Sequence, residues 1–148
     1  MNTFLLPTND RIQAWRDLRI QISNEVDIMV QLELLAKWWS VAPISKYVLD
    51  PNDSEFWPVP WELITENRYC ETTIAYMMAH TLLLAGIDET RIKMAFMRDA
   101  LEEVMVVILD DHYVLNFSYG EVFDMDEIDE TFKKLHVFKI ENGNFVKI

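Results

Sequence analysis

The chain is poor in cysteine and glycine. Among its 148 residues are one cysteine and three glycines. The single cysteine, Cys70, excludes an intramolecular disulfide and a metal site built from cysteines. The scarcity of glycine excludes a collagen-like chain or a flexible linker. Because 51% of the residues are hydrophobic and 26% are charged, the chain can bury a core, and its length predicts a single domain over residues 1–148.

Positive charge is also scarce. Lysine and arginine number 13 against 25 aspartates and glutamates, which gives a net charge of −12. Binding to a nucleic-acid backbone requires a concentrated basic face, and the longest basic run here is Lys133-Lys134. We therefore expect no direct contact with nucleic acid and none with an anionic membrane surface.

The sequence also lacks a long hydrophobic run. The longest candidate, residues 74–87, is interrupted by His80 and Thr81 and is shorter than the ~20 residues that span a bilayer. The N-terminal residues lack the basic stretch and long apolar core of a signal peptide. These features predict a soluble, cytosolic protein.

The first half of the chain has the periodicity of helices. Apolar residues recur at helical spacing over residues 8–22 and again over residues 24–40. Residues 71–85 are apolar on nearly all sides, which predicts a central buried helix that Gly86 ends. Residues 41–60 contain four prolines and predict an extended connector, with Pro60 starting a short helix. The candidate N-caps are Thr8, Asn9 or Asp10 for the first helix and Ser23 or Asn24 for the second.

The second half of the chain has the two-residue period of strands. The expected strands are residues 92–97, 104–109, 113–117, 121–123, 135–140 and 145–148. The first is expected to be half-buried and the second to be interior. Asn142-Gly143 fits a type I′ turn that joins the last two strands in a hairpin. Helices followed by an antiparallel sheet predict an α+β fold.

Cys70 directly precedes the buried helix, where a helix N-terminus lowers the pKa of a thiol. A cysteine nucleophile also needs a base, usually histidine, and a third group that orients the base. His80 lies ten residues further along the same helix, about 15 Å away by helical rise. This leaves His112 as the base and Asn116 as the orienting group of a hypothetical triad. The alternative, which we favour, is that Cys70 is a small residue that fills a gap in the core.

We expect no metal site and no cofactor. The spacings between the three histidines match no ligand motif. The segment from Asp124 to Asp129 is similar to a calcium loop, but it lacks the glycine at the sixth position and has Leu135 in place of the glutamate at the twelfth. We expect these acids to cap a short helix over residues 127–133 instead.

Two groups of residues are candidates for binding. The tryptophans of the Trp57-Pro-Val-Pro-Trp61 block are expected to lie either in the core or in an interface. Residues 99–130 contain eleven acidic residues and no lysine or arginine, which indicates a solvated negative face, a docking surface for a basic partner, or a mimic of DNA. The candidate binding residues are Trp57, Trp61, Asp110, Asp111, Asp124 and Asp126.

Four stretches of the chain resemble a group of small uncharacterised proteins from contractile-tailed phages. The most specific is Trp57-Pro-Val-Pro-Trp61-Glu-Leu-Ile64. The others are Lys46-Tyr-Val-Leu-Asp-Pro51, Tyr69-Cys70 and Tyr113-Val-Leu-Asn116. The resemblance implies a viral origin and no established chemistry.

A second resemblance is to the transglutaminase-like and papain-like architecture. There a cysteine at a helix start is followed by a strand that bears histidine and by a further strand that carries aspartate or asparagine. Cys70 matches the first position and Asn116 the last, but Glu102-Glu103 stands where the histidine should open the middle strand. The resemblance therefore implies an enzyme scaffold without its base, used for binding.

The sequence predicts a non-enzymatic phage protein, a virion or assembly component located in the virion or the host cytoplasm. Its partners are expected to be other phage or host proteins with basic surfaces. Two alternatives remain open: an acidic inhibitor or DNA mimic directed at a host protein, and a cysteine hydrolase or acyl transferase that uses Cys70, His112 and Asn116.

Overall fold

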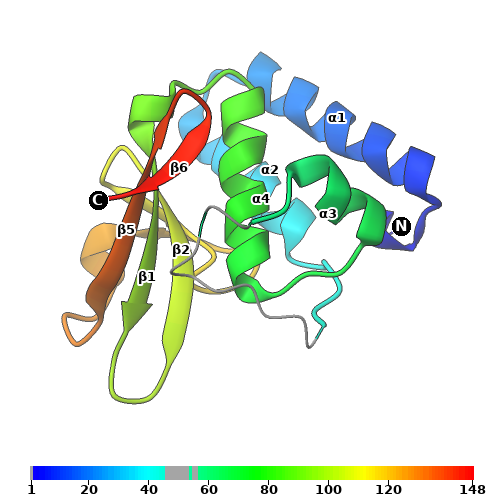
Figure 1. Cartoon of the computed structure of the whole chain (residues 1–148). Helices are drawn as coiled ribbons and strands as arrows, with labels where there is room; N and C mark the ends of the chain where they lie inside the picture. The colour runs from blue at the N-terminus through cyan, green and yellow to red at the C-terminus, as the bar shows by residue number, and fades with distance from the viewer. Residues whose placement is uncertain (1, 46–53, 55–56) are drawn as a thin grey trace.

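A central helix lies between an antiparallel sheet and the remaining helices in this computed structural model (Figure 1). The structure describes residues 2–45, 54 and 57–148, and its mixed helices and strands confirm the predicted α+β class. The helices are α1 (Thr8–Asn24), α2 (Ile28–Trp39), α3 (Pro60–Glu66) and α4 (Glu71–Leu84). The strands are β1 (Ile92–Arg98), β2 (Glu103–Leu109), β3 (Tyr113–Leu115), β4 (Val122–Asp124), β5 (Lys133–Glu141) and β6 (Asn144–Lys147).

The described strands form one sheet in the order β4-β3-β2-β1-β5-β6. Each strand is antiparallel to its neighbours. Helix α4 packs on β1 and β2 with one side, and α1, α2 and α3 contact its other side. Figure 1 shows α4 in the middle, with the sheet on one side of it and α1 and α3 on the other.

The start of α1 differs from the expected one. The helix begins at Thr8, with Pro7 in the N-cap position and no side-chain cap. The prediction that Thr8, Asn9 or Asp10 caps this helix is therefore wrong. Proline suits the position before a helix because its φ is fixed and it has no N–H that would need a partner there.

The boundary between α1 and α2 also lies elsewhere than predicted. Asp27 caps α2, because its carboxylate accepts a hydrogen bond of 2.9 Å from the Met29 N–H. Ser23 and Asn24 belong to α1 instead, so their prediction as caps is wrong. The C-terminal end of α1 is stabilised by Gln31. Its side-chain amide donates to the Ile22 carbonyl at 2.9 Å and so pairs one of the carbonyls that a helix end leaves free.

Helix α4 is the buried core helix that the sequence predicts. Ten of its 14 residues are buried, and Gly86, at φ 101°, follows the helix end. Thr81 keeps its hydroxyl paired inside this apolar setting by donating to the Met77 carbonyl at 2.6 Å and accepting from the Trp15 indole N–H at 2.9 Å. The second bond ties α1 to α4.

Both faces of the sheet are covered. Ile92 and Met94 of β1 face the core around α4, whereas Ala95 and Met97 face a second cluster on the opposite side. The prediction that this strand is half-buried is therefore wrong. Its second face is covered because Phe117, Phe123, Met125, Ile128 and Phe132, from the chain between β3 and β5, pack against it.

The turns of the second half agree with the sequence except at one point. Asn142 and Gly143 have φ values of 52° and 79°, as a type I′ hairpin turn requires. The helix predicted over residues 127–133 is wrong, since Asp124 caps a single 3₁₀ turn over Met125–Glu127 instead. Glu127 accepts a hydrogen bond from the Asp124 N–H at 2.9 Å and so closes the turn on itself.

The predicted connector over residues 41–60 lies partly outside the described residues. Within the described part, Pro60 starts α3 as predicted. None of the helices in residues 2–45, 54 and 57–148 is long and apolar enough to cross a membrane.

Candidate functional site

Cys70 occupies the N-cap position of α4. The Thr73 hydroxyl accepts a hydrogen bond of 2.7 Å from the Cys70 N–H. The same hydroxyl lies 2.9 Å from the Cys70 carbonyl oxygen and 3.7 Å from its Sγ, the two atoms to which it can donate. Only 7% of the cysteine is exposed. The thiol is therefore held at a helix N-terminus and almost closed off from solvent.

Asn116 lies beside the start of α4. It follows β3 with a φ of 68° and is 2% exposed. Its Nδ2 donates to the Glu71 carbonyl at 3.2 Å and to the Met105 carbonyl at 3.0 Å. Asparagine tolerates the left-handed conformation better than most residues, and here that conformation turns the amide toward α4. The structure thus brings Asn116 next to Cys70 through the backbone of the residue that follows the cysteine.

Glu71 is the residue of this site that sequence reasoning missed. Its carboxylate accepts a hydrogen bond from the Met105 N–H, and its side chain is half-buried. Burial raises the pKa of Glu71 to about 7, and the negative charge of Glu102 adds to the rise while the Met105 hydrogen bond opposes it. Its position directly after Cys70, at the start of a buried helix, was the available signal. The site therefore holds a carboxyl group that titrates close to neutral pH.

Replacement of Glu71 by glutamine is expected to stabilise the protein at high pH and not at low pH. Glu71 has a raised pKa, so its contribution to stability is present below about pH 4.5 and is lost as the pH rises through about 7. Glutamine keeps the acceptor for Met105 without the charge. Because water partly screens the half-exposed group, Glu71→Gln should raise the free energy of unfolding by about 1–2 kcal/mol at about pH 8.

Urea denaturation of both proteins at about pH 4 and about pH 8 measures this difference. Glu33→Gln, at an exposed position of α2, controls for the general loss of one negative charge. An equal gain for Glu71→Gln at both pH values would contradict the proposed environment of Glu71.

None of the three histidines lies at the start of α4. His80 is ten residues further along that helix, about 15 Å away. His112 lies in the turn between β2 and β3, where its Nε2 is 3.1 Å from Asp124 Oδ2. His112 follows the far end of β2, about 13 Å or more from Met105 by strand rise. The structure therefore does not bring His112 together with Cys70 and Asn116.

The third histidine is separated from β2 by a neighbouring strand. Phe96 of β1 is paired with Met105 on one side and with His136 of β5 on the other. Two strand spacings amount to about 10 Å. The His136 ring stacks on Phe96, with 6.0 Å between ring centroids.

The first residue of β2 is Glu103, at the position where the resemblance to the transglutaminase-like architecture calls for a histidine. Its carboxylate lies 3.5 Å from the Arg98 guanidinium, and both side chains are exposed. Glu102, the preceding residue, is exposed as well. Two exposed glutamates, Glu102 and Glu103, therefore stand where the resemblance places a histidine.

The two tryptophans of the proline-rich block have different environments. Trp57 is 7% exposed and packs against Tyr76 and Phe138, with ring centroids 5.3 and 5.2 Å away. Trp61 is 46% exposed, and its ring lies edge-on to Trp15 at 5.4 Å. Trp57 is thus a core residue, and Trp61 presents part of its ring at the surface.

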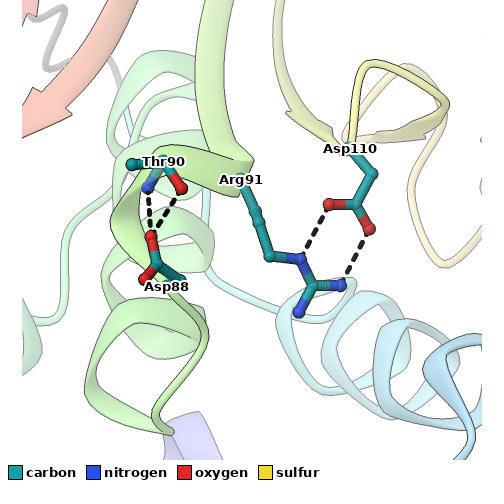
Figure 2. A network of polar contacts seen from close by, with 4 residues as sticks. All are labelled: Asp88, Thr90, Arg91 and Asp110. Carbon is teal, nitrogen blue, oxygen red and sulfur yellow. Dashed lines mark hydrogen bonds and ion pairs between the residues drawn. The ribbon is translucent and has the colours of Figure 1, made fainter.

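Two of the candidate acidic residues are paired with basic side chains. Figure 2 shows the Arg91 guanidinium donating to both oxygens of Asp110, at 2.7 and 2.8 Å. This hydrogen-bonded pair lowers the pKa of Asp110. Beside it, Asp88 accepts hydrogen bonds from Thr90. Asp111 is 2.9 Å from the Lys93 ammonium group. Part of the negative charge of the acidic segment is therefore balanced within the chain.

The remaining two candidate acids lie on the segment that covers the second face of the sheet. Asp124 contacts His112 with one carboxylate oxygen and accepts from the Asp126 N–H with the other. Asp126 itself is exposed. Among the described residues no group of three or more histidine, cysteine, aspartate or glutamate side chains is placed to hold a metal ion.

Comparisons with known proteins identify the fold. No family model and no curated protein matches the chain. The chain is similar to three solved structures of LapG from Legionella pneumophila. The calcium-bound form has a TM-score of 0.74 at 14% identity, covering 90% of this chain and 77% of that chain. A second LapG structure gives 0.73 at 16% identity, with the same coverage of 90% and 77%. The EGTA-treated form gives 0.71 at 17% identity, covering 89% and 74%.

LapG has the transglutaminase-like and papain-like fold of cysteine proteases. The resemblance that rests on Cys70 and Asn116 is thus confirmed as a likeness of fold. At 14–17% identity the likeness extends to the fold alone. This chain is thus similar in fold to the LapG structures, with carboxylates where the resemblance places a histidine.

Proposed function

We propose that this protein binds other proteins and catalyses no reaction, on a scaffold that it shares with cysteine proteases. The observation that carries the proposal concerns Asn116. Its Oδ1 is buried and has no hydrogen-bond donor among the residues that the structure describes. In a cysteine-based triad this acceptor orients the base by receiving its N–H. Asn116 matches the orienting position of the resemblance, and Glu102 and Glu103 stand where the resemblance requires the histidine.

Two further features support this proposal. The three imidazoles lie along α4, in the β2–β3 turn and on β5, about 10 Å or more from the region of Cys70 and Asn116. The cysteine is also almost fully buried, whereas a reactive thiol needs to be reached by its substrate. Both features favour a structural role for Cys70.

A second candidate function is a cysteine hydrolase or acyl transferase. The adjacency of Cys70 and Asn116 favours it, and so does the fold. In that mechanism Glu71, whose pKa of about 7 is suited to accepting a proton, would act as the base in place of His112. The proton of the thiol would move to the Glu71 carboxylate before the sulfur attacks a carbonyl carbon.

The reactivity of Cys70 distinguishes the two functions. We expect the native protein to react with iodoacetamide at least about 100-fold more slowly than the same chain in urea, because burial keeps the reagent away from the sulfur. Mass spectrometry of the alkylated chain measures the rate at a single site, since the sequence has one cysteine. The Cys70→Ser variant gives the background. Native labelling as fast as in urea, abolished by Glu71→Gln, would establish the second function instead.

We propose further that the partners are proteins with basic surfaces. The segment across the second face of the sheet exposes five acidic residues. These are Glu121, Asp126, Glu127, Asp129 and Glu130. A contact between this segment and a basic protein would weaken as salt screens the charges. An acidic inhibitor or DNA mimic aimed at a host protein would share this salt dependence.

The resemblance of the block from Trp57 to Ile64 to phage proteins supports a place in a phage particle or in its assembly. Quantitative mass spectrometry of purified particles tests this origin. A virion component is expected at a fixed copy number relative to the other structural proteins. Absence from particles, together with salt-sensitive binding to one host protein, would favour the inhibitor.

A further inference from the structure

A cavity of about 430 Å³ lies beside the second half of α4. Its walls come from that helix, from the β5–β6 hairpin, and from Ser54, Trp57, Val59 and Pro60. Figure 1 shows where α4 and the β5–β6 hairpin lie in the fold. Trp57, Pro60, Tyr76, His80, Asn144 and Phe145 are among its lining residues. The volume is in the range of small-ligand sites. His80 is ten residues from Cys70, so the cavity is separate from the site at the helix start.

Four of the described lining residues contribute aromatic rings to the cavity wall. The Tyr76 and His80 rings lie 4.5 Å apart, and each is 5.2 Å from the ring of Phe145. Trp57 adds a fourth ring at 6.0 Å from Phe145. Tyr76 and His80 are one helical turn apart, so α4 presents both on the same side. Rings from three separate segments therefore meet around one space.

Two polar groups of the wall are left unpaired by residues 2–45, 54 and 57–148. Neither the His80 ring nitrogens nor the Tyr76 hydroxyl makes a hydrogen bond within the part of the chain that the structure describes. Burial lowers the pKa of His80 to about 4, so its ring is neutral at pH 7 and offers a nitrogen lone pair. Burial, reinforced by the charge of Glu62, raises the pKa of Tyr76 to about 12, which keeps the phenol neutral.

The charges around the cavity are negative. Glu62 of α3 is close enough to Tyr76 to affect its titration. The Glu89 carboxylate accepts hydrogen bonds from the Asn142 and Gly143 N–H groups at 3.2 and 3.1 Å, and Gly143 lines the cavity. Among the residues that the structure describes, no lysine or arginine lines the cavity. The nearby negative charge disfavours an anion here, whereas a cation would meet ring π-systems and neutral acceptors and would be attracted by the charges of Glu62 and Glu89.

We propose that this cavity binds the guanidinium group of an arginine side chain presented by a partner protein. Guanidinium is planar and weakly hydrated, stacks on aromatic rings and donates five hydrogen bonds, so it suits these walls better than an ammonium group does. The choice of a protein as the source of the cation rests on the proposed function. The inference that the cavity binds a guanidinium group is independent of that proposed function.

Titration with N-acetyl-arginine-methylamide tests the cavity by itself. The neutral analogue made from citrulline has nearly the same shape and serves as the control ligand. We expect the arginine compound to bind at least about 10-fold more tightly, because only it carries the charge. Binding is followed by the NMR shifts of the Trp57 indole and of the amides of Tyr76, His80 and Phe145.

Variants locate the site. His80→Phe keeps a ring but removes the acceptor, and Glu62→Gln removes a nearby charge; each should weaken binding of the arginine compound by about 5-fold. Tyr113→Phe, a tyrosine change away from the cavity, should have no effect. Thermal melts verify that each variant is folded.

Equal binding of the two compounds, no binding of either, or insensitivity to both cavity variants would overturn the inference. If the arginine compound binds as expected but no partner protein is found for the chain, the cavity assignment stands and the proposed function fails.

Discussion

Replacing Trp15 by alanine is expected to lower the free energy of unfolding by about 3–5 kcal/mol. The indole is fully buried in α1, and its N–H donates to Thr81 of α4 at 2.9 Å. Its ring also contacts Trp61 of α3 at 5.4 Å between centroids. Alanine would leave a cavity among three helices and remove the donor for a buried hydroxyl. Denaturation in urea, followed by circular dichroism, measures the change.

Two smaller changes separate the contributions at Trp15. Trp15→Phe keeps most of the ring but removes the donor, and is expected to cost about 1–2 kcal/mol. Adding Thr81→Val to Trp15→Phe removes both hydrogen-bonding groups, so the pair should cost less than the sum of the single changes. If Trp15→Ala cost less than about 1 kcal/mol, the packing of α1 on α4 described here would be wrong.

Asn116→Ala is expected to cost about 3 kcal/mol of unfolding free energy. The partly buried Glu71 carbonyl and the buried Met105 carbonyl lose the Asn116 amide as donor, at about 1 kcal/mol each. A further ~1 kcal/mol comes from placing alanine in the left-handed conformation that asparagine holds at φ 68°. The change would loosen the connection between the start of α4, which carries Cys70, and the strands β2 and β3.

Two other substitutions at this position separate its conformation from its hydrogen bonds. Asn116→Gly removes the steric cost but not the loss of the donor, and should cost about 2 kcal/mol. Asn116→Asp has the same shape, cannot donate while ionised and places a charge near Glu71, so it should be at least as harmful as alanine. Losses below about 0.5 kcal/mol in all three variants would show that Asn116 does not connect these elements.

A loosened helix start also has a consequence for Cys70. We expect Asn116→Ala to increase the rate at which iodoacetamide labels the native protein, since burial is what protects the thiol. In a hydrolase the same substitution would instead reduce the reactivity of the thiol, because the orienting group of the base would be lost. A faster labelling rate in Asn116→Ala would therefore support the proposed binding function, and a slower rate would support the enzymatic one.

The sequence by itself determined the class of fold and most of its elements. The apolar character of residues 71–85 and the glycine after them define α4, and Asn142-Gly143 defines the final hairpin. These features are local, because the period of hydrophobicity and the demands of a positive φ depend on a few neighbouring residues. The adjacency of Cys70 and Asn116 was available only through a resemblance to a known architecture.

Only the tertiary structure decided which side chains meet and in what protonation state. The short capped turn at Asp124 replaced an expected helix because Glu127 could reach back to it, which no periodicity reports. Glu71 and His80 have ordinary sequence neighbours, yet their pKa values move to about 7 and about 4 because distant segments of the chain exclude water from them. Burial and contact are properties of the packed chain, since they depend on residues that are far apart in the sequence.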